Sequence, residues 1–390
     1  MNIGVLTSGG DASGMNAAIR AVVRTATLER MTVFGISFGY KGLCETSELK
    51  DPTPCLKQLK TEDVVRILGT GGTILKSARY LKFQRNFAER KQALENLQGN
   101  DITGLVVLGG DGSFRGAMAL YKTNLKAKII ENLRIICIPC TIDNDIPCTK
   151  YTIGSDTALN TVLDCIDKIR DTAYSHKRAF LIQVMGRDCD YLPRMTSISS
   201  GAHIVLGPND TADLNEIYKS IKHGFKKGKE FVIIIVAEGL KRIRNFNGKY
   251  VNLKTTSNKK YSAAEKIGQL ISARPLEIRP VVLGHVQRGG RPSCFDRILA
   301  TRFGVSAIKA LSDNNILTNQ PLMLALQNSS TTEDSINCIP LADVIKMLSK
   351  NANLKTHDKY QFISQAVIRG FSSKLKWPEY FKTTLKENCS

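Results

Sequence analysis

Short runs rich in Ile and Val alternate along the chain with longer segments in which apolar residues recur every three or four positions. The runs have the length and the β-branched content of buried strands, and the longer segments have the periodicity of helices with one apolar face. Such alternation is typical of a parallel sheet whose strands are connected by helices. We predict strands at residues 3–7, 31–37, 102–109, 134–139, 178–185, 203–207, 230–237 and 278–284.

The chain of 390 residues exceeds the usual size of one hydrophobic core. We therefore expect an α/β protein of two lobes, each a mainly parallel sheet flanked by helices. We assign residues 1–154 plus about 287–337 to a larger lobe, and residues 155–286 plus about 338–390 to a smaller lobe. Residues 241–260 are polar and contain Gly and Asn, which predicts a loop or an insertion.

Chemically distinctive residues directly follow the predicted strands. In open α/β sheets the ligand crevice lies at the carboxyl ends of the strands. Six clusters at such ends therefore predict one binding site at one edge of the structure. The clusters are Gly9-Gly10, Gly109-Gly110-Asp111, Thr141 to Asp145, Met185-Gly186-Arg187, Glu238, and His285 to Arg288.

Two of these clusters are glycine-rich turns between a strand and a helix. Glycines allow the backbone to approach a phosphate closely, and the start of the helix supplies free N–H groups. The turn at Gly9 is compatible with a phosphate site or with a plain connection. The segment Gly109 to Ser113 contains Asp111, which would repel a bare pyrophosphate but suits a Mg²⁺ ion that bridges phosphates. A surface turn with a solvated Asp is the alternative.

The segment Thr141-Ile-Asp143-Asn-Asp145 places two carboxylates and a hydroxyl on one short loop after a buried strand. Phosphoryl transfer requires a group that accepts the hydroxyl proton, together with donors and a metal that manage the charge of the transferred group. We assign the first task to Asp143. Asp145 can raise the pKa of Asp143 by like-charge repulsion, or orient a water on the metal. A structural turn rich in Asp and Asn is the alternative.

Several arginines are candidates for binding a phosphate, because a guanidinium group pairs with phosphate oxygens through two hydrogen bonds. Each arginine alone is more often a surface ion pair. His285 and Arg288 stand together at a strand end beside two glycines, which favours a terminal phosphate as the ligand, with a structural histidine as the alternative. The arginines are Arg79, Arg178, Arg187, Arg279 and Arg288.

In order and in spacing, these segments resemble the signature motifs of 6-phosphofructokinases over roughly residues 3–311. The combination is specific, whereas the Gly-Asp-Gly segment alone also occurs in NAD kinases and lipid kinases. The matching segments are Gly4 to Arg20, Gly109 to Ser113, Thr141 to Asp145, Thr152 to Asn160, Val184 to Arg187, and Leu283 to Gly290.

The resemblance implies a phosphofructokinase-like fold, with nucleotide bound to the larger lobe and sugar phosphate to the smaller lobe. It also implies transfer of the γ-phosphoryl group of ATP to the 1-hydroxyl of fructose 6-phosphate, which is the committed step of glycolysis, with the help of Mg²⁺. Asp143 matches the family's proton acceptor, and Asp111 matches its magnesium-linked carboxylate.

The resemblance also assigns roles to sets of residues. The catalytic set is Asp143, Asp145, Thr141, Arg79 and Gly9. The nucleotide-phosphate set is Gly9, Arg79, Tyr80, Gly110, Asp111, Gly112 and Ser113. The sugar-phosphate set is Thr141, Asp143, Met185, Gly186, Arg187, Glu238, His285 and Arg288. Arg178 and Arg279 match residues that reach in from a neighbouring subunit, which implies an oligomer with shared active sites, typically a homotetramer.

Two positions separate ATP users from pyrophosphate users in the family. Gly112 is the choice of ATP users, because a carboxylate there would crowd and repel the α-phosphate. At the position of Cys140, ATP users carry Gly and pyrophosphate users carry Lys; a cysteine adds no positive charge, so ATP is favoured. A pyrophosphate-dependent enzyme and a catalytically weak regulatory subunit are the alternatives. The sugar-side motif that begins at His285 argues against an NAD kinase relative.

Several positions depart from the family pattern. Lys76 and Cys148 stand where glycine is usual, and a side chain there can obstruct a ligand or strain the backbone. Asp190 replaces a glycine near the sugar-phosphate turn and would repel a sugar phosphate. His203 and Glu230 depart from the bacterial effector site, which leaves allosteric control open.

Composition limits the other function classes. The chain is 42% hydrophobic and 23% charged, and no apolar run approaches the roughly 20 residues that cross a bilayer, so we expect no membrane span. The net charge is +20 but the basic residues are dispersed, so we expect no nucleic-acid partner. The start reads as a strand, which predicts a cytoplasmic protein. The ten cysteines lack a regular spacing, and Cys137-x-x-Cys140 stands alone, so we expect reduced thiols and no metal there.

Overall fold

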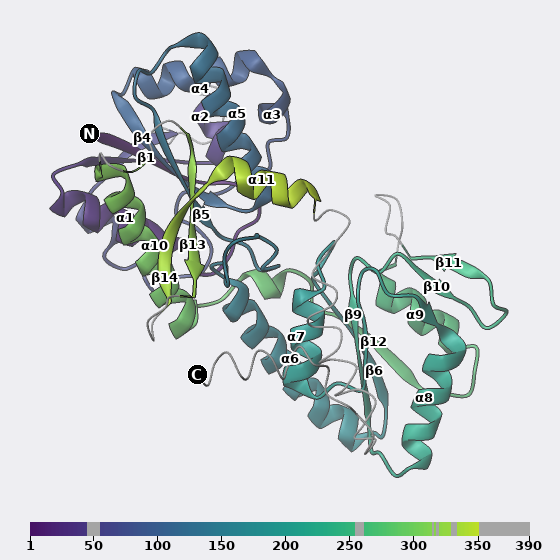
Figure 1. Ribbon diagram of the computed structural model, residues 1–390. Coiled ribbons are helices and arrows are strands. Elements are labelled where there is room, and N and C mark those ends of the chain that lie inside the picture. The colour runs from purple at the N-terminus through teal and green to yellow at the C-terminus, as the bar shows by residue number, and fades with distance from the viewer. Residues whose placement is uncertain (45–54, 254–260, 314–315, 317–319, 329–333, 351–390) are drawn as a thin grey trace, which may run out of the picture.

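Seven strands form the larger of two main sheets, in the order β14-β13-β5-β4-β1-β2-β3 (Figure 1). The five inner strands run parallel, while β3 and β14 pair antiparallel at the two edges. The strands are β1 Asn2–Thr7, β2 Thr32–Ile36, β3 Leu56–Leu59, β4 Ile102–Gly109, β5 Arg134–Pro139, β13 Leu322–Gln327 and β14 Ser335–Pro340. The computed structural model describes residues 1–44, 55–253, 261–313, 316, 320–328 and 334–350.

Helices cover both faces of the larger sheet, because its strands are apolar on both sides. Successive strand residues face opposite cores: Val106 packs with α1 and α10, and Leu105 packs with α4, α5 and α11. The helices are α1 Met15–Leu28, α2 Gly39–Cys44, α3 Lys82–Arg85, α4 Phe87–Gln98, α5 Asp111–Ala127, α10 Cys294–Ser312 and α11 Leu341–Lys350. None of the helices in the described part of the chain is long and apolar enough to cross a membrane.

The second main sheet has four parallel strands in the order β12-β6-β9-β7. Its two faces are again covered, by α6 on one side and by α8 and α9 on the other, and α7 packs against α6, β7 and β9. A small three-stranded sheet, β11-β10-β8, adjoins it. The elements are α6 Ser155–Ser175, β6 Ala179–Val184, α7 Tyr191–Ser200, β7 Ile204–Leu206, β8 Ala212–Asp213, α8 Leu214–Lys226, β9 Val232–Ala237, β10 Arg242–Arg244, β11 Tyr250–Asn252, α9 Ala263–Ile271 and β12 Ile278–Val282.

The long helix α6 connects the two parts (Figure 1), and a buried carboxylate on α10 fixes its start. Asp296 is fully buried and accepts hydrogen bonds from the backbone N–H groups of Gly154, at 2.9 Å, and Thr157, at 2.8 Å. It also accepts a short bond of 2.5 Å from the Thr157 hydroxyl. These bonds satisfy donors that the first turn of a helix leaves free.

The two-lobed α/β fold is confirmed, and each of the eight predicted strands has a counterpart. Residues 241–260 were expected to be a loop or insertion; within them β10 and β11 form an antiparallel hairpin, and residues 254–260 lie outside the described residues. The assignment of residues from about 338 onward to the smaller lobe is wrong for the described part. There, β14 pairs with β13, and Leu341 of α11 is buried in a core of the larger sheet. Residues 351–390 lie outside the described residues, and the other lobe boundaries remain predictions.

Candidate active site

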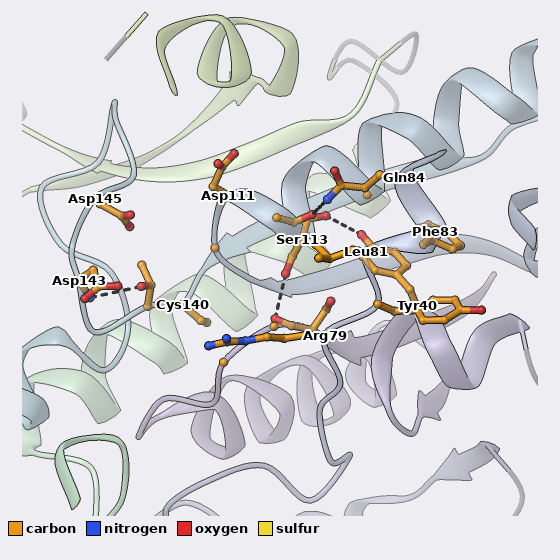
Figure 2. Close-up of a pocket in the computed structure, with 18 of the residues that line it drawn as sticks. Tyr40, Arg79, Leu81, Phe83, Gln84, Asp111, Ser113, Cys140, Asp143 and Asp145 are labelled. Carbon is orange, nitrogen blue, oxygen red and sulfur yellow. Dashed lines mark hydrogen bonds between the residues drawn. The ribbon is translucent and has the colours of Figure 1, made fainter. Parts of the chain in front are cut away.

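The carboxyl ends of β1, β4 and β5 border an open pocket of about 280 Å³ (Figure 2). Figure 2 shows Asp143 and Asp145 at one end of this pocket, Tyr40 and Phe83 at the other end, and Arg79 between them. The predicted site residues that line it are Gly9, Arg79, Tyr80, Gly110, Asp111, Gly112, Ser113, Thr141, Asp143, Asp145 and Arg288. Three segments that are far apart in the sequence thus meet where the strand-end rule placed them.

The aromatic end of the pocket was not predicted from the sequence. The ring of Tyr40 stacks on that of Phe83, with centroids 4.3 Å apart, and its hydroxyl donates to the carbonyl of Ser113 at 2.7 Å. Gly116 on α5 makes room for this arrangement, because a Cβ at that position would lie 2.6 Å from the Tyr40 ring. Tyr40 follows the predicted strand 31–37, so the strand-end rule applied to that strand would have found it.

The two glycine-rich turns are locked together beside the pocket. The hydroxyl of Ser113 donates to the carbonyl of Ser8 at 2.9 Å, and Ser77 donates to the carbonyl of Gly9 at 2.9 Å. Gly9 has φ +90°, a backbone conformation that favours glycine. Gly109 allows the close approach, since a Cβ there would lie 2.3 Å from the Ser113 hydroxyl oxygen. The pocket wall therefore consists of backbone held in a fixed position.

The first turn of α5 faces the same space with its free N–H groups. A Cβ built on Gly112 would have only the Gln84 side-chain nitrogen nearby, at 3.9 Å, so the pocket is open in front of this residue. The carboxylate of Asp111 lies at the pocket and pairs with Arg115 one turn later, with 2.6 Å between Oδ1 and Nε. A positive helix end and one partly exposed carboxylate thus lie side by side.

The loop after β5 carries the two candidate catalytic carboxylates. Burial raises the pKa of Asp143, while the guanidinium groups of Arg288 and Arg79 act in the opposite direction. Desolvation by the surrounding protein and the nearby charge of Asp143 raise the pKa of Asp145 to about 7, although its side chain is exposed to the pocket. The like-charge effect that the sequence predicted for Asp143 therefore acts on Asp145. Because the two carboxyls interact, their titration belongs to the pair.

Hydrogen bonds hold the carboxylate loop in place. The backbone N–H of Asp143 donates to the Thr141 hydroxyl at 3.2 Å, and the Thr152 hydroxyl donates to the Thr141 carbonyl at 2.6 Å. The backbone N–H of Thr152 donates to the Asn144 side chain at 2.9 Å. Thr152 lies three residues before the start of α6, so these bonds connect the loop to the N-terminal end of this helix.

Cys140 borders the pocket but does not project into it. Its side chain is 1% exposed and belongs to the core between the larger sheet, α1 and α10. Burial raises the pKa of the Cys140 thiol well above its usual range, and the same is true of Cys137. No group of three or more metal-ligating side chains occurs among the described residues.

The sugar-side residues adjoin the pocket from the smaller sheet. Burial and the nearby charge of Asp143 raise the pKa of Glu238, and the cations Arg288, Arg187 and His285 lower it, so these side chains lie within electrostatic reach of one another. Met185, Gly186, Arg187, Glu238 and His285 do not line the pocket itself. Arg288 does, and it donates to the carbonyl of Asp11 at 3.2 Å.

Gln287 connects the two sugar-side turns and was not predicted as a site residue. Its side chain is 1% exposed, accepts a hydrogen bond from the backbone of Met185 at 3.0 Å and donates to the carbonyl of Gly284 at 2.9 Å. Its position in the sequence was a signal, because Gln287 lies between His285 and Arg288, which were predicted to bind the sugar phosphate.

A family model described as Phosphofructokinase matches residues 2–311. The chain belongs to the phosphofructokinase family. It is 40% identical over 364 residues to the ATP-dependent 6-phosphofructokinase of Caldanaerobacter subterraneus, covering 93% of this chain and 99% of that one. It is 43% identical to the enzyme of the same name from Natranaerobius thermophilus, covering 79% and 85%. Pichia pastoris phosphofructokinase in the T-state has a similar structure, with a TM-score of 0.77 and 32% identity over 94% of this chain and 38% of that one.

Two family-matched arginines lie away from the pocket of their own chain. Arg178 precedes β6 and Arg279 is the second residue of β12, so both lie near the amino ends of parallel strands, opposite the site. Glu277 pairs with both, at 2.9 Å from the Arg178 Nε and 2.6 Å from the Arg279 Nη2. Within one chain these arginines do not complete the site.

The departures from the family pattern now have a structural description. Lys76 and Cys148 both have positive φ, +55° and +70°, so their side chains do strain the backbone, at a cost of about 1 kcal/mol or more each. Neither of them lines the pocket. Asp190 is only 3% exposed and pairs with Arg194, so it does not present a bare charge to a sugar phosphate.

Proposed function

We propose that this member of the family is an ATP-dependent 6-phosphofructokinase, which transfers the γ-phosphoryl group of ATP to the 1-hydroxyl of fructose 6-phosphate. The observation that carries the proposal is the composition of one pocket. It joins an aromatic end, which suits a nucleotide base, through two fixed glycine-rich turns to a carboxylate of raised pKa at Asp143. The sugar-side residues lie next to that same carboxylate.

Asp143 acts as the general base in this proposal. The 1-hydroxyl oxygen attacks the γ-phosphorus, the bond from that phosphorus to the β,γ-bridging oxygen breaks, and ADP leaves with the electron pair. Asp143 takes the hydroxyl proton, and its raised pKa brings its proton affinity closer to that of the attacking group. Arg79, the backbone at Gly9 and the start of α5 stabilise the charge of the transferred group.

The residues present fit a magnesium ion that enters with the nucleotide. Mg²⁺ prefers one or two carboxylates together with phosphate oxygens and waters, and does not need a cage made only of protein groups. Asp111 offers one carboxylate at the phosphate turn, and Arg115 engages one of its two oxygens. We propose that Asp111 holds Mg²⁺, which would neutralise charge on the β- and γ-phosphates.

We also propose that the sugar phosphate is bound by Met185, Gly186, Arg187, Glu238, His285 and Arg288, with Thr141 beside Asp143. Arg178 and Arg279 would reach the site of a neighbouring subunit in a homotetramer, and their position away from their own pocket supports that assignment. A cytoplasmic location, as expected for a glycolytic enzyme, belongs to the same proposal.

The structure bears on two alternatives. A pyrophosphate-dependent enzyme would not need the end of the pocket that Tyr40 and Phe83 line, and Gly112 leaves open space at the phosphate turn, where a carboxylate would repel the α-phosphate of ATP. A catalytically weak regulatory subunit was suggested by Asp190 and Lys76, and the burial of Asp190 removes one of these two reasons. Both observations support ATP as the donor and the chain as an active enzyme.

A donor assay tests the proposal. Purified protein with fructose 6-phosphate and Mg²⁺ should form fructose 1,6-bisphosphate with ATP and not with pyrophosphate. Product formed only from pyrophosphate would refute the choice of donor. Binding of fructose 6-phosphate in calorimetry without turnover from either donor would instead support the regulatory subunit.

A further inference from the structure

An arginine is buried between two aspartates in the smaller lobe, close to the sugar-side turn. Arg194 on α7 is 2% exposed; its Nε lies 3.3 Å from Asp190 Oδ2, and its Nη2 lies 2.6 Å from Asp210 Oδ1. Asp190 and Asp210 are 4% and 16% exposed at their side chains. A buried charge is costly unless a partner of opposite charge compensates it. In this triad (Asp190, Arg194, Asp210) the guanidinium group compensates both carboxylates.

The triad links two turns at the carboxyl edge of the smaller sheet. Asp190 ends the turn after β6, and Asp210 belongs to the turn after β7, where its second oxygen accepts from the backbone of Gly207 at 2.7 Å. A Cβ on Gly207 would lie 3.0 Å from Arg194 Nη2 and 3.4 Å from the Cβ of Asp190. The guanidinium group therefore fills the space between the two turns.

The carboxylate of Asp190 pairs with Arg194 and does not cap the helix that follows it. Asp190 occupies the N-cap position of α7, where an Asp side chain ordinarily accepts a hydrogen bond from the first helical turn. It makes no such bond and pairs instead with Arg194, whose backbone N–H donates to the Asp190 carbonyl at 2.9 Å. The triad thus fixes the first turn of α7.

That first turn packs against the proposed sugar-phosphate turn. Gly186 has φ +123°, and a Cβ there would lie 2.8 Å from the carbonyl of Cys189 and 3.1 Å from Pro193 on α7. On its other side the backbone of Gly239 donates to the Gly186 carbonyl at 3.3 Å. Cys189 also donates from its thiol to the carbonyl of Asp143 at 3.3 Å. A shift of α7 would therefore move both the sugar-side turn and the catalytic loop.

We propose that Arg194 is a positioning residue for the sugar-phosphate site: it neutralises Asp190 and Asp210 and holds α7 where Gly186 and Arg187 can meet the substrate. This inference rests on the proposed function, because it takes the turn from Met185 to Arg187 to bind a sugar phosphate. The inference also explains how Asp190 can stand where the family usually has glycine, because Arg194 compensates the charge of Asp190. Without Arg194, two buried negative charges would remain near the site of an anionic substrate.

The test compares binding of the two substrates in Arg194→Met, which keeps an unbranched side chain about as long as the aliphatic part of arginine and removes the charged guanidinium group. We expect the Kd of fructose 6-phosphate, from calorimetry, to rise between about 10- and 100-fold. The Kd of ATP should change much less, because only the loop at Asp143 contacts the turn before α7 and the rest of the ATP pocket lies on the larger sheet. Arg244→Met is the matched control: its exposed guanidinium lies 3.8 Å from Asp213, and its loss should leave both values unchanged.

A second variant separates charge from packing. In the neutral triad Asp190→Asn/Arg194→Met/Asp210→Asn no buried charge is left unpaired, and we expect most of the affinity for fructose 6-phosphate to return. Arg194→Lys retains one charge but reaches only one aspartate, so it should be intermediate, and it serves if Arg194→Met does not fold.

Three results would overturn the inference. These are equal sugar-phosphate affinity in Arg194→Met and the unmodified protein, an equal loss of affinity for both substrates, and a neutral triad as weak as Arg194→Met. If the unmodified protein itself does not bind fructose 6-phosphate, the proposed function is wrong, and the proposed role of Arg194 is wrong as well.

Discussion

Gly112 offers a direct test of where the donor lies, because the structure leaves space in front of it. A carboxylate introduced by Gly112→Asp would stand on the first turn of α5, at the proposed phosphate site. At about 5 Å from a phosphate charge and an effective dielectric constant near 20, the repulsion is about 3 kcal/mol, or roughly 100-fold in kcat/KM for ATP. An Asp in the first turn of a helix is otherwise favourable, so the variant should fold.

Two matched variants isolate the charge. Gly112→Ala adds only a Cβ, which would lie 3.9 Å from the side-chain nitrogen of Gln84, and should retain activity with ATP. Gly112→Asn has the shape of Asp without its charge and should lose much less than the Asp variant. The assay is the steady-state kcat/KM for ATP at saturating fructose 6-phosphate. Unchanged kcat/KM in Gly112→Asp, or an equal loss in the Asn and Asp variants, would refute the electrostatic reasoning.

Three further predictions concern pH, stability and metal. The nearby charge of Asp188 raises the pKa of Asp143, so Asp188→Asn should move the acidic limb of the kcat/KM profile to lower pH; an unshifted limb would contradict this. Asp296→Ala leaves the buried donors of Gly154 and Thr157 unsatisfied, at a cost of about 3 kcal/mol or more in chemical denaturation, and Asp296→Asn should lose less. Chelation of divalent cations should abolish turnover and leave the circular dichroism spectrum unchanged, and a loss of folded signal would argue for a structural metal.

The positions along the chain of four of the five inner strands of the larger sheet, and the place of the site, could be predicted because each follows from a local rule. The Ile- and Val-rich runs are buried on both faces, so their period and length identify them, and the strand ends then locate Asp111 and Asp143. The edge strands β3 and β14 and the inner strand β13 were missed, and the order of the strands within the sheet was not predicted. One reason is that an edge strand such as β3, Leu56–Leu59, carries exposed polar residues and gives only a weak apolar signal.

Features that depend on packing between distant segments could not be predicted. Asp190 was expected to repel the substrate, because the sequence does not show that Arg194 is buried against it. Cys140 left the donor open, since only the fold shows that its side chain lies in the core. Gln287 and Tyr40 were missed although the sequence could have located both: Gln287 lies between His285 and Arg288, and Tyr40 follows the predicted strand 31–37.

The most direct test of the central claim is the rate of fructose 1,6-bisphosphate formation by Asp143→Asn, measured beside its affinities for ATP and fructose 6-phosphate. We predict a rate at least about 100-fold below that of the unmodified protein, with both substrates still bound, because the variant lacks only the proton acceptor. An undiminished rate in a variant that binds both substrates would contradict the assignment of Asp143 as the base.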